Sequence, residues 1–123
     1  MSESKLEIQE RQEGHVTVLI LSGQITLDAG DLVFKTRVND LLGQGRTKIV
    51  ADMANVTYVD SAGLGMLASK LRTVREKGGD LKLARVSAKI QRVLNMMKLP
   101  IAFETFEDDA AAIRSFAGKG ERH

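Results

Sequence analysis

The residues best able to do chemistry in this chain stand together in the run Asp60-Ser61-Ala62-Gly63-Leu64-Gly65. An apolar stretch typical of a buried strand precedes this run, and an apolar periodicity typical of a helix follows it. A serine at a helix start can accept a hydrogen bond from the free N–H groups of the first turn. Those groups and the helix dipole also favour a negative charge there. We therefore predict that Ser61 caps the helix and can carry a phosphoryl group without disturbing the fold.

Catalysis by Ser61 itself lacks the residues that it would need. A hydrolase elbow reads Gly-x-Ser-x-Gly, but Val59 occupies the position of the first glycine. A nucleophilic serine also needs a positioned base. The two histidines are His15, in a predicted hairpin turn, and His123, the last residue. We predict that the protein is not an enzyme.

The sequence also offers few candidate residues for binding a metal or a cofactor. Carboxylates gather at Glu104, Glu107, Asp108 and Asp109, where capping of a predicted helix explains them more simply. The chain has no cysteine and no Gly-x-x-x-x-Gly-Lys-[Ser/Thr] phosphate loop. We predict no metal site and no cofactor.

Composition narrows the class of protein. The net charge is only +2 and aromatic residues make up 4%, so the clustered cations and stacking rings of a nucleic-acid surface are missing. The N-terminus lacks the apolar segment of a signal peptide, and no apolar run approaches the roughly 18 residues of a membrane span. We expect a cytoplasmic domain spanning residues 1–123, with an ordered core from about residue 5 to residue 117 and polar ends. We expect neither nucleic-acid binding nor membrane insertion.

The elements that must position Ser61 alternate regularly along the chain. The patterns predict strands near residues 6–12, 16–21, 47–53, 81–84 and 103–106, and helices near residues 31–42, 61–77, 87–97 and 108–116. Gly14 suggests a hairpin between the first two strands, and the second is apolar enough for the interior of a sheet. Helices then alternate with strands, which favours parallel pairing with right-handed crossovers. The predicted fold class is α/β: a mixed sheet of four to five strands with about four helices, largely over one face.

Gly63 and Gly65 are unusual inside a helix, where each costs up to about 1 kcal/mol relative to alanine. One interpretation is close packing of the helix start against a strand. The other is a bare surface beside Ser61 that the backbone of another protein can approach. Gly65 and Ser69 share the helical face of Ser61 and would extend such a surface. Both interpretations stay open at this point.

The run Val59–Gly65 after an apolar strand resembles the signature of STAS domains, specifically of bacterial anti-sigma factor antagonists. The resemblance extends over nearly the whole chain. The matching segments are Leu21–Ile25, Ile49–Asp52, Val93–Leu99 and Glu107–Ala111.

This resemblance implies a partner switch. Such an antagonist binds an anti-sigma factor that is also an ATP-dependent serine kinase, and binding releases the sigma factor. The kinase then phosphorylates the motif serine, here Ser61, and the complex dissociates until a serine phosphatase removes the phosphate. The residues expected to contact the partner are Thr26, Asp28, Asp60, Ala62, Gly63, Gly65, Met66 and Ser69.

One position departs from the family pattern. Where the family commonly has an aspartate that helps partner binding and phosphorylation, this chain has Thr26, and Asp28 follows two residues later. The departure keeps an alternative open, a STAS adaptor subunit of a transport or signalling complex that is never phosphorylated.

Overall fold

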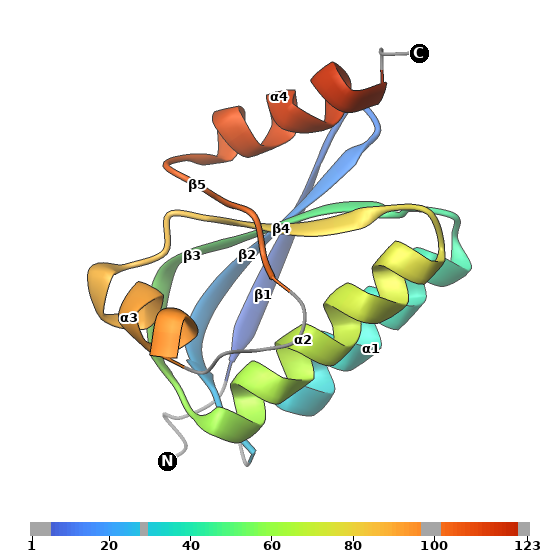
Figure 1. The fold of residues 1–123 in the computed structure, drawn as a ribbon. Coiled ribbons are helices and arrows are strands. Elements are labelled where there is room, and N and C mark those ends of the chain that lie inside the picture. Colours follow the sequence, from blue (N-terminus) through green and yellow to red (C-terminus); the bar gives the residue numbers. More distant parts are fainter. Residues whose placement is uncertain (1–5, 28–29, 97–101, 121–123) are drawn as a thin grey trace.

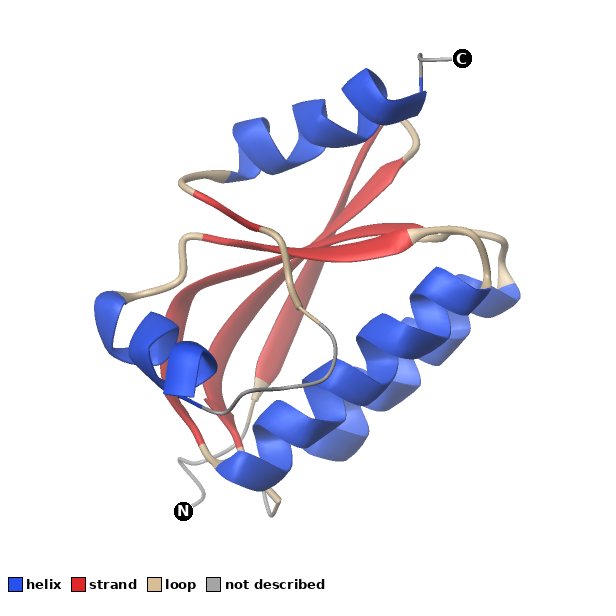
Figure 2. Ribbon diagram, viewed as in Figure 1, coloured by secondary structure: helices blue, strands red, loops and turns tan. Residues whose placement is uncertain are grey.

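The computed structural model describes residues 6–27, 30–96 and 102–120. Figures 1 and 2 show a twisted sheet with helices on both faces. The strands are β1 (Glu7–Glu13), β2 (Val16–Ile25), β3 (Lys48–Val59), β4 (Asp80–Ala84) and β5 (Thr105–Phe106). The helices are α1 (Asp31–Gly43), α2 (Ser61–Glu76), α3 (Ala88–Met96) and α4 (Asp109–Gly120). No helix in these described ranges is both long and apolar enough to cross a membrane.

The sheet has the strand order β1-β2-β3-β4-β5, in which β1 is antiparallel to β2 and the other neighbours are parallel. The predicted mixed α/β sheet and its hairpin are therefore confirmed. Gly14, in the turn between β1 and β2, has φ 64°, a conformation that glycine adopts without strain. Strands β2 and β3 run further than the sequence predicted, because they pair with each other up to Ile25 and Val59. This extension brings both strand ends to the start of α2.

Three helices cover one face of the sheet, as expected. The predicted helical stripes supply the core there: Phe34, Val38 and Leu41 from α1, Leu64, Leu67 and Leu71 from α2, and Ile90 from α3. Full burial of each such side chain contributes about 1.5–3 kcal/mol. Packing rather than helix propensity therefore fixes the direction of α2, and with it the position of Ser61.

Among the described helices, α4 lies on the opposite face of the sheet from α1, α2 and α3 (Figure 2). Its Ala112 and Phe116 pack against Val16 and Val18 of β2. The alternate residues of β2 belong to the core beneath α1 and α2. A strand that is buried on both faces has a nearly continuous run of apolar residues, which explains why the first part of β2 is so apolar.

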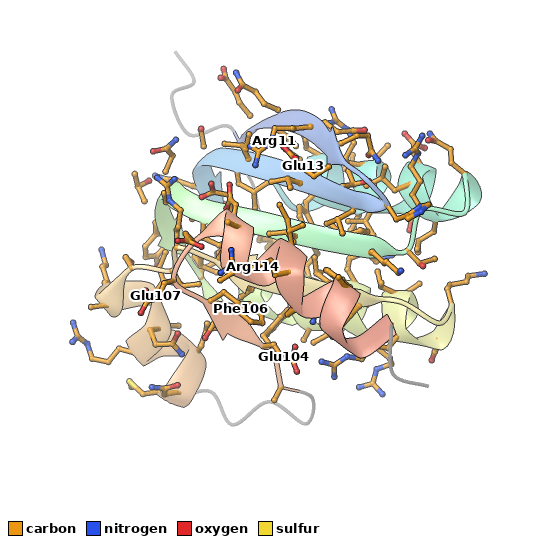
Figure 3. The ribbon with its side chains drawn as sticks, turned by 90° about the horizontal axis from the view of Figure 1, so that it is seen from above. Arg11, Glu13, Glu104, Phe106, Glu107 and Arg114 are labelled. Atoms are coloured by element: carbon orange, nitrogen blue, oxygen red, sulfur yellow. The ribbon has the colours of Figure 1, made fainter. Side chains whose placement is uncertain are left out.

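A buried cation anchors α4 to the sheet. Lys82 of β4 is fully buried, and its Nζ lies 2.7 Å from Ser115 Oγ and 3.0 Å from Glu104 Oε1. The same Nζ lies 4.3 Å from the centre of the Phe116 ring. Figure 3 shows Glu104 beside α4. Buried charges are retained where they are paired and hydrogen-bonded, so Lys82 is a structural residue.

A carboxylate at the start of α4 makes stability depend on pH. Burial raises the pKa of Asp109 above its ordinary value of 3.8, and the neighbouring Asp52 carboxylate raises it further. The positive charges of Arg11 and Arg85 lower the pKa of Asp109 and so oppose this shift. Arg11 Nη2 lies 3.6 Å from Asp109 Oδ2, and Arg85 Nε lies 3.7 Å from Asp52 Oδ1. The folded state therefore binds the Asp109 proton more tightly than the unfolded state does, and ionisation of Asp109 costs stability.

Asp109→Asn is expected to raise the free energy of unfolding at pH 7, because the amide has no charge to bury. In the wild type, the contribution of Asp109 falls as the pH rises from 3.8 through the raised pKa. Urea unfolding across this window should give a flatter pH dependence for the variant. Parallel curves for the two proteins would contradict this assignment.

Candidate functional site at the start of α2

The ends of β2 and β3 bring the candidate site together. Ile25 pairs with Val59, and the backbone N–H of Asp60 donates to the Ile25 carbonyl over 3.3 Å. Thr26 directly follows Ile25, so it lies at the same edge of the sheet as Asp60. Helices α1 and α2 both begin at this end of the molecule (Figure 1).

The Asp60 carboxylate holds the start of α2. Asp60 has the extended backbone of an N-cap residue, with φ −94° and ψ 177°. Its Oδ1 accepts from the backbone N–H of Gly63 at 2.7 Å, and its Oδ2 accepts from that of Leu27 at 3.3 Å. The prediction that Ser61 caps the helix is therefore wrong. Asp60 does so because one carboxylate reaches both the first turn of α2 and the β2–α1 loop.

Ser61 is left free for another role. It is the first residue of α2 and is exposed, and within the described chain its hydroxyl makes no hydrogen bond. The first turn of α2 contains no acidic residue. The hydroxyl therefore projects from the positive end of a helix and is accessible to another protein.

Close packing and an open surface, the two interpretations of the helix glycines, each apply to one of them. A Cβ atom on Gly63 would lie 1.9 Å from the Ile25 carbonyl oxygen, so the start of α2 packs directly on the end of β2. A Cβ atom on Gly65 would meet nothing within 4 Å. Gly63 therefore serves close packing, and Gly65 belongs to an open surface.

Four small residues form this open surface of α2. Ser61, Ala62, Gly65 and Ser69 are all exposed, and we call them the small-residue face. They stand at helical spacing, so they follow one side of α2. The structure brings these predicted contact residues together next to Asp60.

Other predicted contact residues lie elsewhere. Met66 is only 8% exposed and packs in the core, so little of its side chain is available to a partner. It lies three residues after Gly63 and shares its buried side of α2. Gly63 is itself buried, and Thr26 is half-buried. Asp28 lies outside the described residues.

Three large apolar side chains near the site were missed by the sequence analysis. Leu27, Leu32 and Tyr58 are 65%, 69% and 47% exposed, and we call them the apolar rim. The N–H of Leu27 is bonded to Asp60, and Tyr58 lies three residues before Ser61. The exposure of Leu32 could have been predicted, because Leu32 falls outside the spacing of the buried residues of α1.

Removing the capping carboxylate is expected to loosen the site. Asp60→Ala loses both hydrogen bonds and should lower the free energy of unfolding by about 1–2 kcal/mol. Asp60→Asn keeps an acceptor oxygen and should cost less. Urea unfolding of both variants measures the difference, and an Asp60→Ala midpoint equal to that of the wild type would contradict the capping role.

Comparisons with known proteins agree with this architecture. A family model described as "Mlab, STAS domain" matches residues 8–101. The anti-sigma F factor antagonist of Paenibacillus polymyxa is 25% identical over 111 residues, which cover 88% of this chain and 94% of the relative.

Two solved structures share the fold. An anti-sigma factor antagonist from Mycobacterium paratuberculosis superimposes with a TM-score of 0.79 at 16% identity, over 93% of this chain and 96% of that one. SpoIIAA of Bacillus, an anti-sigma factor antagonist in its unphosphorylated form, gives a TM-score of 0.72 at 17% identity, over 91% and 99% of the two chains. The sheet order, the helix that follows β3 and the match over residues 8–101 lead to one conclusion: this chain belongs to the STAS domain family.

Proposed function

We propose that this protein is an anti-sigma factor antagonist that works by partner switching. It binds an anti-sigma factor that is also a serine kinase, and reversible phosphorylation of Ser61 controls that binding. The observation that carries the proposal is the exposed, unbonded hydroxyl of Ser61 at the first position of α2, beside a separate capping residue. The relative from Paenibacillus polymyxa, named as an anti-sigma F factor antagonist, supports the same role.

The small-residue face and the apolar rim together form the proposed partner surface. Small side chains allow a partner backbone to approach α2 closely, and the open space over Gly65 favours this approach. Burial of the exposed apolar side chains Leu27, Leu32 and Tyr58 would supply the driving force for association. Asp60 and Thr26 lie at the edge of this surface.

Phosphorylation would act on binding while leaving the fold intact. A phosphoryl group adds about −1.5 to −2 charges at neutral pH. The positive end of α2 tolerates this charge in the free protein. In the complex, the same charge would be removed from water next to the Asp60 carboxylate, which is costly without a paired cation. The antagonist needs no catalysis of its own, because the partner kinase and a serine phosphatase carry out the two reactions in the cytoplasm.

Affinity purification from the native host tests the proposal. The tagged wild type and a tagged Ser61→Ala variant should each capture an ATP-binding anti-sigma factor. Added ATP should place phosphate on Ser61 and release the wild-type protein, whereas the variant should stay bound. A wild-type complex with a transport ATPase that ATP leaves unmodified would contradict the proposal and support the adaptor alternative.

A further inference from the structure

Two adjoining pockets lie at the amino ends of β2 and β3, away from Ser61. The first has a volume of about 320 Å³ and is lined by Gly14, His15 and residues 45–48. The second has a volume of about 350 Å³ and shares Gly14, His15 and Lys48 with the first. Each reaches the lower end of the range of small-ligand sites, which begins near 300 Å³.

Pairing of the parallel strands places two loops side by side here. Val16 begins β2, Lys48 begins β3, and Thr17 pairs with Ile49. The β1–β2 turn and the α1–β3 loop therefore meet at one edge. Gly45 has φ 78° and, like Gly14, has no atom within 4 Å of where its Cβ would be. Neither glycine is therefore packed against another described segment of the chain.

The described lining of the first pocket contains two cationic side chains, Arg46 and Lys48, and no carboxylate. His15 and Thr47 are the other polar residues of this lining. Within the described part of the chain, none of the three basic side chains makes an ion pair. The Arg46 guanidinium donates to the neutral Gln44 side chain, from Nε to Oε1 at 3.1 Å. Two cationic side chains without an ion pair at one hollow favour a multivalent oxyanion such as phosphate, which arginine can bind through two parallel hydrogen bonds.

The second pocket adds an apolar wall to this charged one. Val16 of β2 and Ile113, Phe116 and Ala117 of α4 line it. Its one carboxylate, Glu13, is already paired with Arg11 at 2.7 Å, and Figure 3 labels both residues on β1. A ligand that satisfies both pockets is therefore anionic at one end and apolar at the other.

We propose that this protein binds a phosphate monoester in these pockets, with the phosphate between Arg46 and Lys48 and its apolar group against Ile113 and Phe116. The site lies roughly 30 Å from Ser61, at a rise of about 3.3 Å per residue over the 10 residues of β2. It therefore does not depend on the proposed partner switch.

A titration of the full chain with two probes tests this site. Inorganic phosphate and phenyl phosphate are added separately at constant ionic strength, and amide shifts are followed by NMR. Both should shift the amides of His15, Arg46 and Lys48. Phenyl phosphate should also shift Ile113 and Ala117 and bind roughly tenfold more tightly, because its ring is buried.

Variants distinguish the site from general attraction to a basic protein. Arg46→Gln and Lys48→Gln should each weaken binding of phenyl phosphate roughly tenfold. Arg72→Gln, which removes an exposed cation from α2, should change nothing. Equal weakening by all three, or no saturable shift at the pocket amides, would overturn the proposal. Equal affinity for both probes would overturn the apolar half and leave a site for free phosphate.

Discussion

Gly63→Ala is expected to destabilise the protein by about 3 kcal/mol or more, the largest loss of stability that we predict for a single methyl group. The added Cβ would lie 1.9 Å from the Ile25 carbonyl oxygen and 2.7 Å from its carbon. Both are backbone atoms, so relief requires that α2 move away from the end of β2. Urea unfolding followed by circular dichroism measures the loss.

Gly65→Ala is the matched control on the same helix. Its Cβ would meet nothing within 4 Å, and alanine is favoured over glycine inside a helix by up to about 1 kcal/mol. This variant should therefore unfold at an equal or higher urea concentration than the wild type. Similar losses in both variants would contradict the assignment of Gly63 to close packing and Gly65 to an open surface.

Ser61→Asp is expected to weaken binding to the anti-sigma factor by roughly 100-fold or more, equivalent to about 2.7 kcal/mol. The reason is that the interface would bury a new carboxylate beside Asp60 without a cation to pair with it. The free energy of unfolding should change by no more than about 0.5 kcal/mol, because the Ser61 side chain is exposed and makes no hydrogen bond within the described chain. Isothermal titration calorimetry with the captured partner measures the affinity.

Ala110→Asp is the control for the charge that Ser61→Asp adds. Ala110 is exposed in the first turn of α4, on the opposite face of the sheet, so this variant adds the same charge to the first turn of another helix. It should bind the partner as the wild type does. Wild-type affinity in Ser61→Asp, or an equal loss in Ala110→Asp, would contradict the proposed surface.

The sequence predicted the elements that local periodicity controls. The spacing of Phe34, Val38 and Leu41 determined the buried side of α1, and that of Leu64 and Leu67 did the same for α2. The strand-to-helix junction at Ser61 was predicted from the change there between a strand pattern and a helical spacing of apolar residues. These features depend on neighbours within a few residues, which a sequence displays directly.

Features that depend on contacts across the fold were not predictable in the same way. Asp60 and Ser61 are both good N-cap residues, and local sequence does not display the bond that Asp60 makes with Leu27, 33 residues earlier in the chain. The stripe on α4 indicated a buried side but not which face of the sheet would cover it. Lysine is usually found on the surface, and Lys82 is buried here because Ser115 and Glu104 bind its ammonium group.

The phosphate occupancy of Ser61 in two fractions from the native host tests the proposed partner switch directly. Site-mapped mass spectrometry would compare protein bound to the anti-sigma factor with free protein, in cells grown with and without stress. We expect unmodified Ser61 in the bound fraction and phosphorylated Ser61 in the free fraction, in proportions that shift with the condition. Phosphorylated Ser61 in the bound fraction, or unmodified Ser61 in both fractions under every condition, would contradict the proposed switch.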